Sequence, residues 1–327
     1  MHVLILGAAG MIGRKLTDRL VADARLGGRA IERMTLIDIV APQLPAGAPF
    51  PVATDACDFS APGAAERMLA GQPDVIFHLA AIVSGEAEAV FDKGLRINLD
   101  GTRRLLDAIR GEMAGHSPRV VFTSSIAVFG APFPEAIPDS FHHTPLTSYG
   151  TQKAICELLL ADYSRRGFLD GIGIRLPTIC VRPGKPNKAA SGFFSGIIRE
   201  PLNGEEALLP VSEDVRHWHA SPRSAVGFLI HAATIDTSGL GVRRNLTMPG
   251  LSVTVAEQIA SLRRVAGERV AGRIRRAPDS LIARIVEGWP RNFDAARAGS
   301  LGFKLVERDF GDIIRFHIDD ELAGRVS

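Results

Sequence analysis

The fold is decided by one stretch near the start of the chain, His2-Val3-Leu4-Ile5-Leu6-Gly7-Ala8-Ala9-Gly10-Met11-Ile12-Gly13. Its first five residues form an apolar run of the length of a buried strand, and a helix-like stretch over residues 14–24 follows the glycines. A strand, a glycine turn and a helix are the context that a dinucleotide fingerprint requires. We expect Gly7 to permit the tight turn, Gly10 to let backbone approach a pyrophosphate, and Gly13 to let helix pack on strand.

The start of the predicted helix supplies the groups that would meet the phosphates. Backbone N–H groups at a helix N-terminus have no partner within the helix, and the helix dipole favours negative charge there. Met11 and Ile12 follow the second glycine, so we expect them to bind the cofactor together with the three glycines. The spacing is G-x-x-G-x-x-G instead of the commoner G-x-G-x-x-G.

An acidic residue ends the second apolar run. The run Met34–Ile37 leads into Asp38, and an acid at this point fits a hydrogen bond to a ribose 2′-hydroxyl. It would repel a 2′-phosphate, and Ile39 after it offers no cation, so the sequence favours NAD over NADP. Asp38 follows Gly13 by more than the usual ~20 residues, and a solvated carboxylate at a strand end is the alternative interpretation.

Two further segments extend the predicted nucleotide site. Asp58 could accept a hydrogen bond from the adenine amino group with Phe59 beside the ring, or it could cap a helix predicted to begin near Ala61. We weigh these two interpretations equally. The apolar run at 75–81 predicts a buried strand, and its last residues would let the cofactor lie close: Leu79, Ala80 and Ala81.

Tyr149 and Lys153 are the candidate catalytic pair. On a helix, a spacing of four residues puts the phenol and the ammonium on one face. An ammonium beside a phenol lowers the phenol pKa from about 10 toward neutrality, and the Ser125 hydroxyl could hold a substrate oxygen against that base. The arrangement predicts proton abstraction from an alcohol, although the pattern alone also occurs on ordinary amphipathic helices.

Taken together, the motifs resemble the extended short-chain dehydrogenase/reductase superfamily, also called NAD-dependent epimerases/dehydratases, over nearly the whole chain. The resemblance implies a general acid or base at Tyr149, a catalytic serine at Ser125, and a Lys153 that binds the nicotinamide ribose and tunes the tyrosine. It also implies that Asn98, counted with the cofactor site, supports backbone nearby. The resemblance rests on Gly7-x-x-Gly10-x-x-Gly13, Asp58, His78-Leu79-Ala80-Ala81, Asn98-Leu99-Asp100-Gly101-Thr102, Ser124-Ser125 and Tyr149-x-x-x-Lys153.

Less generic stretches resemble one branch of that superfamily, at residues 82–88, 175–178, 181–187, 195–201 and 248–255. Members of the branch oxidise the C2 hydroxyl of the four-carbon sugar acid D-erythronate with NAD, which gives the 2-oxo acid. A nucleotide-sugar epimerase or dehydratase is the alternative. Ile126-Ala127 after Ser125 argues against dehydration, because a dehydratase would usually carry an acidic pair there. An NAD-sensing regulator would tend to lose the tyrosine or the lysine, and this chain has both.

The order of elements predicts the fold class. Through residue 175 apolar strands alternate with helices, which predicts an α/β, Rossmann-like, doubly wound parallel sheet. Residues 176–327 are richer in loops and short helices and predict a smaller, mixed substrate-binding portion. We expect a strand-like stretch at 243–248 to return to the main sheet, so the two domains would be partly interleaved.

Candidate substrate contacts follow from this topology. Ligands bind beyond the carboxyl ends of parallel strands, where Ser84, Ser125 and Thr178 should lie. A sugar acid also needs a partner for its carboxylate, and a guanidinium fits best. We select Arg182, with three other cations as further candidates: Lys185, Arg216 and Arg223.

The composition is that of an ordinary soluble globular protein, with 327 residues, 46% hydrophobic and 23% charged. A net charge of +2 gives no argument for nucleic acid as a partner. Three cysteines without a C-x-x-C pair predict a reducing compartment and no metal site. No signal peptide and no membrane span is expected, so we predict a cytoplasmic protein, and helices at 91–109 and 149–163 could pair in a homodimer.

Overall fold

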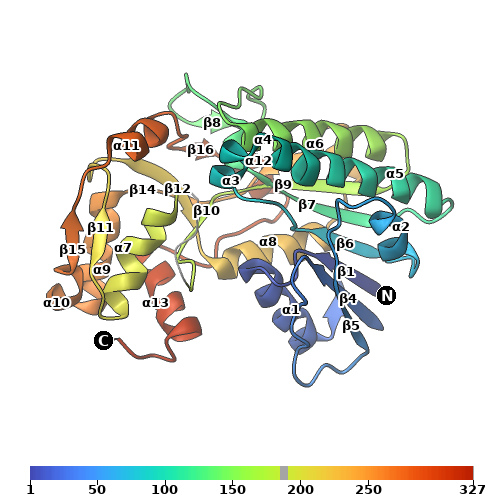
Figure 1. Ribbon diagram of the computed structural model, residues 1–327, viewed down its shortest axis with the longest axis horizontal. Coiled ribbons are helices and arrows are strands. Elements are labelled where there is room, and N and C mark those ends of the chain that lie inside the picture. Colours follow the sequence, from blue (N-terminus) through green and yellow to red (C-terminus); the bar gives the residue numbers. More distant parts are fainter. Residues whose placement is uncertain (185–190, 327) are drawn as a thin grey trace.

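The computed structural model describes residues 1–184 and 191–326. Its centre is a seven-stranded sheet in the order β13-β9-β7-β6-β1-β4-β5, in which every neighbouring pair is parallel (Figure 1). The predicted α/β class with a Rossmann-like parallel sheet is therefore confirmed. The strands are β1 (His2–Leu6), β4 (Arg33–Asp38), β5 (Val52–Ala56), β6 (Val75–His78), β7 (Arg119–Ser125), β9 (Asp170–Leu176) and β13 (Asn245–Thr247).

Helices cover both faces of this sheet because the side chains of each strand alternate between the faces. In β1, Val3 and Ile5 pack against α1 (Met11–Asp23) and α8 (Pro222–Thr234). Leu4 and Leu6 pack on the opposite side. Each fully buried Leu, Ile or Val contributes roughly 1.5–3 kcal/mol. The helices of that opposite layer, above the sheet in Figure 1, are α2 (Ala64–Leu69), α5 (Thr102–Glu112) and α6 (Ser148–Arg165).

The C-terminal part of the chain contributes to the main sheet. The stretch expected to return to it forms β13, which pairs in parallel with β9, so that prediction is confirmed. Helix α8 covers the sheet from below, with Phe228 and Leu229 buried in the same core as β1. The division of the chain at residue 175 stays a prediction.

A second hydrophobic core lies on the left of Figure 1. Phe194, Ile198, Leu262 and Phe310 are buried there between helices of the C-terminal part. A small sheet in the order β10-β12-β14 connects this core to the end of β9. Its elements are β10 (Thr178–Ile179), α7 (Gly192–Leu202), β12 (Arg216–Ala220), β14 (Leu251–Thr254), α9 (Val255–Ala266) and α13 (Phe310–Glu321).

Three helices differ from their predicted bounds. The helix expected from residue 14 begins at Met11, directly after the glycine turn. The helix expected near Ala61 begins at Ala64, because residues 58–61 form a turn in which the Ala61 N–H bonds the Asp58 carbonyl. The helix expected over 91–109 is divided into α4 (Phe91–Gly94), a π-helix η1 (Leu95–Gly101) and α5.

The remaining elements are short, and they connect the two cores or cover their edges. They are β2 (Arg25–Leu26), β3 (Arg29–Ala30), α3 (Ser84–Ala89), η2 (Ile126–Val128), β8 (Ile137–Pro138), β11 (Ala207–Leu209), η3 (Ser238–Leu240), α10 (Glu268–Ala271), β15 (Ile274–Arg276), α11 (Ser280–Glu287), β16 (Phe293–Asp294) and α12 (Ala296–Ser300).

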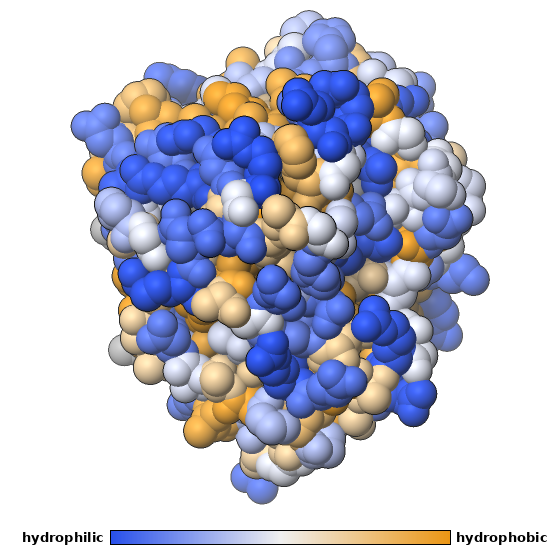
Figure 2. Space-filling model, turned by 90° about the vertical axis from the view of Figure 1, so that its right-hand side faces the viewer, coloured by the Kyte–Doolittle hydropathy of each residue, from blue (hydrophilic) through white to orange (hydrophobic). Residues whose placement is uncertain are grey.

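Polar and hydrophobic side chains are mixed on the surface seen in Figure 2, which faces the right-hand side of Figure 1. Hydrophobic side chains appear there singly or in small groups, as is usual for protein surfaces. Within residues 1–184 and 191–326, no helix combines the length and the hydropathy needed to cross a membrane.

Candidate active site

The glycine turn leaves no room for side chains. Gly7 has a φ of +89°, and a Cβ on it would lie 2.7 Å from the Ala80 backbone nitrogen. A Cβ on Gly13 would lie 2.7 Å from the Ala8 Cα, so the turn and the first helical turn need glycine at both positions. No side chain caps α1, whose N-cap is Gly10, so the N–H groups around Met11 remain available to an anion. This cradle fits a dinucleotide pyrophosphate.

Asp38 lies directly against the glycine turn. One of its carboxylate oxygens accepts a hydrogen bond of 2.9 Å from the Ala9 N–H, and the other accepts 2.7 Å from the Ile39 N–H. The carboxylate is therefore held at the carboxyl end of β4, beside the place where a ribose would lie. Its hydrogen bond to that ribose stays a prediction.

Asp58 organises the turn before α2. Its carboxylate accepts 2.9 Å from the Ser60 N–H and 2.8 Å from Arg96. Burial raises the pKa of Asp58, but the hydrogen bonds from Ser60 and Arg96 outweigh it and hold this pKa below its ordinary value. Asp58 therefore does not cap α2, whose N-cap is Gly63 without a side-chain cap, and its adenine contact stays a prediction. Phe59 is buried with its ring edge-on to His78, and its place beside an adenine stays a prediction.

The three catalytic candidates are brought together by β7 and α6. Ser125 is the last residue of β7, and its Oγ accepts 3.1 Å from the Ala127 N–H, which leaves its hydroxyl hydrogen free to donate. Thr147 caps α6 by accepting from the Gly150 N–H, so Tyr149 and Lys153 are one turn apart on this helix. The Ser125 side chain lies close enough to the phenol to lower its pKa, and the Lys153 Nζ lies 5.7 Å from the centre of the Tyr149 ring.

The electrostatics of the pair differ from the prediction. Burial raises the pKa of Tyr149 to about 12, and the charge of Arg182 and the Ser125 hydrogen bond lower it only in part. The Lys153 Nζ donates 2.7 Å to the Thr123 carbonyl, and burial lowers the pKa of this lysine to about 8. The prediction that Lys153 brings Tyr149 toward neutrality is therefore wrong for the protein by itself, because desolvation outweighs the effect of neighbouring cations.

Asn98 supports the loop after β6, as the resemblance implied. Its side chain accepts 2.9 Å from the Ile82 N–H, donates 3.3 Å to the Ile82 carbonyl, and donates 2.8 Å to the Gln152 side chain. Asn98 lies in the π-helix η1, a kind of element that often marks functional sites. Sequence reasoning missed Gln152, whose signal was its place between Tyr149 and Lys153. Leu79, Ala80 and Ala81 are half-buried in this loop, and direct contact of these residues with a cofactor stays a prediction.

The substrate candidates have different surroundings. Ser84 is half-buried at the start of α3, and Thr178 begins β10, two residues after the Leu176 that pairs with Ser125. The Arg182 guanidinium donates 3.3 Å to the Ile179 carbonyl and acts electrostatically on Tyr149, so it lies on the catalytic side.

Two other cations are engaged elsewhere. Arg216 donates 2.7 Å to the Ser252 carbonyl, and Arg223 donates to Asp320 on the surface. A contact of either with the substrate carboxylate stays a prediction. Lys185 lies outside the described residues.

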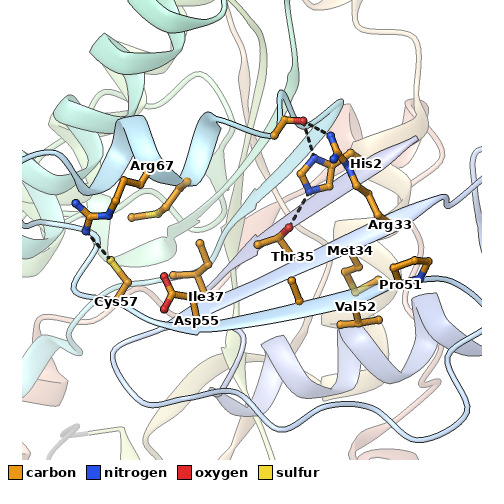
Figure 3. A pocket seen from close by; sticks show the side chains of 13 residues that line it. His2, Arg33, Met34, Thr35, Ile37, Pro51, Val52, Asp55, Cys57 and Arg67 are labelled. Carbon is orange, nitrogen blue, oxygen red and sulfur yellow. Dashed lines mark hydrogen bonds between the residues drawn. The ribbon is translucent and has the colours of Figure 1, made fainter.

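A cavity of about 390 Å³ lies away from these candidates, along β4 and β5 (Figure 3). Its side chains include His2, which lies 2.9 Å from the Thr35 hydroxyl, and Arg67, which lies 3.7 Å from the Cys57 Sγ. None of the three catalytic candidates lines it. In the described part of the chain, no three His, Cys, Asp or Glu side chains could together hold a metal ion.

Known proteins similar to this chain agree with the geometry. The model of the NAD dependent epimerase/dehydratase family matches residues 3–221. The chain is 48% identical to D-erythronate dehydrogenase of Cupriavidus necator over 98% of both chains. It is 43% identical to D-erythronate dehydrogenase of Haemophilus influenzae, over 98% of this chain and 100% of that protein.

A solved structure is similar over the whole chain. It is the crystal structure of the nucleoside-diphosphate-sugar epimerase from Agrobacterium tumefaciens, with 66% sequence identity and a TM-score of 0.96. The similarity covers 100% of this chain and 96% of that one. With its glycine cradle and its Ser125, Tyr149 and Lys153 cluster, the chain belongs to the NAD dependent epimerase/dehydratase family.

Proposed function

We propose that this protein is an NAD-dependent dehydrogenase that oxidises the C2 hydroxyl of D-erythronate to the 2-oxo acid. The observation that supports the reaction type is the placement of Tyr149 and Lys153 one turn apart on α6, with the Lys153 Nζ 5.7 Å from the Tyr149 ring and Ser125 at the end of β7. The substrate rests on the two D-erythronate dehydrogenases that match this chain over nearly its full length.

The residues for cofactor binding follow from the cradle. Gly7, Gly10, Gly13 and the N–H groups of Met11 and Ile12 would hold the pyrophosphate, and Asp38 would bind the ribose. When bound, oxidised NAD supplies a hydride acceptor and a positive charge beside the reacting carbon. Lys153 would hold the nicotinamide ribose while its Nζ stays fixed by the Thr123 carbonyl.

In the reaction, Tyr149 takes the proton of the C2 hydroxyl and Ser125 donates a hydrogen bond to the same oxygen. Because the Ala127 N–H already fills one acceptor position on Ser125, the serine hydroxyl is oriented to donate. A phenol with a pKa of about 12 is protonated at neutral pH. Bringing it to 7 corresponds to about 7 kcal/mol of preferential stabilisation of the phenolate. Positive charge close to Tyr149 must therefore contribute to the base.

Arg182 is the cation of this chain that we assign to the substrate. Its positive charge lowers the Tyr149 pKa more than the Ser125 side chain does, and a planar guanidinium matches a carboxylate through two parallel hydrogen bonds. A carboxylate bound there would place C2 of a small 2-hydroxy acid near the phenol. Ser84, at the start of α3, would contact the same substrate.

The test is NADH absorbance with purified protein, NAD and D-erythronate. Absorbance should rise, and Tyr149→Phe should lower kcat by about 10²- to 10⁴-fold while the Kd for NAD changes little. The chain has two tyrosines, so Tyr163→Phe is a matched control: its phenol donates to Asp107 at 2.6 Å, away from the site. A mutant with phenylalanine at position 149 that kept most of its rate would exclude Tyr149 as the base.

A nucleotide-sugar epimerase is the second candidate, because the protein of the 66% identical crystal structure carries that description. An epimerase regenerates its NAD in each cycle and accumulates no NADH. Wild-type protein that left D-erythronate unchanged but interconverted a nucleotide sugar, followed by proton NMR, would favour this candidate over the dehydrogenase.

The assembly and location form part of the same proposal. Phe91 on α4 and Ile155 and Leu158 on α6 are exposed hydrophobic side chains, which supports pairing of these helices in a homodimer. The three cysteines are all free, which supports a reducing compartment such as the cytoplasm. Light scattering after size exclusion should give twice the mass of one chain, and Leu158→Glu should reduce it to a monomer.

A further inference from the structure

Thr178 and His217 form a hydrogen bond, and one backbone carbonyl determines which of the two side chains is the donor. His217 lies on β12 and is buried, and its Nδ1 is 2.9 Å from the Pro290 carbonyl oxygen. A carbonyl can only accept a hydrogen bond, so Nδ1 carries the proton. The ring is neutral, because burial lowers the pKa of His217 to about 4. Nε2 is then an acceptor.

The Thr178 hydroxyl has one hydrogen, and in this geometry that hydrogen is used in the bond to His217. Thr178 Oγ1 lies 2.8 Å from the His217 Nε2, so the hydroxyl donates to the ring. The lone pairs of Oγ1 are all that remains for another partner. Thr178 can therefore accept a hydrogen bond from a ligand but cannot donate one.

The imidazole is held so that it cannot turn to the opposite arrangement. The His217 ring stacks parallel to Phe194, with centroids 5.2 Å apart, and lies 5.3 Å from Trp289. A ring flip would set a carbon atom against the Pro290 carbonyl and break both hydrogen bonds. The aromatic packing and the carbonyl together fix the tautomer.

Thr178 is near the reacting groups. It follows Leu176, the register partner of Ser125, by two residues. Thr178 is only half-buried, although His219, its register partner on β12, is fully buried. On the basis of the proposed function, we infer that Thr178 binds a hydroxyl of the substrate beyond C2, and that His217 is the positioning residue that makes Thr178 an obligatory acceptor. A carboxylate, which only accepts, is excluded from Thr178 and is left to Arg182.

Enzyme and substrate variants together test this inference. The substrates are D-erythronate and (R)-2-hydroxybutyrate, which lacks the hydroxyls at C3 and C4. Thr178→Val should lower the ratio of kcat/KM for D-erythronate over the deoxy acid by about 10-fold, because the substrate hydroxyl loses its acceptor. His217→Phe keeps the ring stack, removes the acceptor and should lower the same ratio.

The double variant separates a shared role from two separate ones. If His217 acts through Thr178, adding His217→Phe to Thr178→Val should change the ratio no further. His231→Phe is the matched control: this histidine also bonds a backbone carbonyl, that of Leu301 at 2.8 Å, and should leave the ratio unchanged. An equal loss with both substrates in His217→Phe would indicate a merely structural role and overturn the inference.

A second measurement needs neither a variant nor turnover. Nitrogen-15 NMR of histidine-labelled wild-type protein at neutral pH should show that His217 is protonated at Nδ1 and unprotonated at Nε2. The opposite tautomer would overturn the inference. No NADH with D-erythronate would refute the proposed substrate, and the tautomer would then decide whether Thr178 is an acceptor.

Discussion

Glu157 and Lys153 are buried charged residues one turn apart on α6, and they differ in the partners that surround them. Glu157 is fully buried and accepts hydrogen bonds from Arg175 at 2.8 Å and from the Ser124 hydroxyl at 2.5 Å, and one of its oxygens lies 3.0 Å from the His143 Nε2. Lys153 is almost as buried, but its hydrogen bond goes to the neutral Thr123 carbonyl. One charge is fully compensated by partners and the other is not.

The pKa values follow from that difference. Burial raises the pKa of Glu157, but His143 and Arg175 outweigh this effect and hold it below its ordinary value, so the carboxylate stays ionised. Burial lowers the pKa of Lys153 to about 8, and the nearby Cys156 and Glu157 offset this effect only in part. A charge that is compensated by partners organises the fold, whereas one that is compensated only in part is available to a ligand.

The compensated cluster connects distant parts of the chain. Arg175 on β9 lies 3.6 Å from Asp139, and Asp139 also accepts 2.7 Å from Arg297 of α12 and 2.7 Å from the Thr247 N–H of β13. Through these bonds, α6 is connected to the last strand of the main sheet and to the C-terminal part. The position of Tyr149 on α6 therefore depends on residues far from it in sequence.

The largest expected effect comes from removing the charge of Glu157, which its partners compensate. Glu157→Gln should lower the free energy of unfolding by about 3–5 kcal/mol, because Arg175 is left as a buried cation without its main partner. Chemical denaturation measures this. Asp162→Asn, on the same helix with an exposed partner in Arg165, is the control and should cost about 0–1 kcal/mol. Equal losses in both variants would mean that Glu157 is not the organising charge.

The next effect comes from removing the charge of Lys153, which is compensated only in part. Lys153→Met should lower kcat/KM by about 10²-fold or more, while the free energy of unfolding should not fall as it does in Glu157→Gln. The reason is that methionine fills the apolar stem and relieves the desolvated ammonium. Steady-state kinetics and denaturation of the same sample measure both. Lys304→Met, at an exposed position, is the control. A destabilisation as large as that of Glu157→Gln would assign Lys153 to the structural side.

The smallest effect concerns His78, which is buried beside Lys153. The Thr102 hydroxyl donates to the Asn98 carbonyl at 2.7 Å, so it accepts from His78 Nε2 at 2.8 Å. Burial, then the charge of Lys153, lowers the pKa of His78 to about 3. Its folded pKa lies below the unfolded value of about 6.5, so its contribution to stability is present above pH 6.5 and is lost as pH falls toward 3.

The measurement is the pH dependence of unfolding. His78→Gln should reduce the slope of unfolding free energy against pH by about 1.4 kcal/mol per pH unit between pH 6 and 4. Identical slopes in the wild type and the variant would mean that His78 takes up its proton in the folded protein.

The sequence by itself predicted the groups that are neighbours along the chain. The strand, the glycine turn and the helix at residues 2–23 are contiguous, so the sequence pattern predicted the cradle, although Ile37 and Asp38 of β4 complete its hydrogen bonds. Tyr149 and Lys153 share one face of α6 because helix periodicity alone brings them together. The family resemblance, the parallel sheet and the return of β13 were predicted from such local patterns and are confirmed.

Only the tertiary structure decided what those groups can do. The pKa of Tyr149 depends on how much water is excluded from it and on Arg182, which lies 33 residues away. The polarity of Thr178 depends on His217 and on the carbonyl of Pro290, from two other segments. Burial and long-range hydrogen bonds are properties of the packed chain. No local pattern encodes them. The sequence therefore identified the reacting side chains, and the tertiary structure determined their protonation states and the direction of their hydrogen bonds.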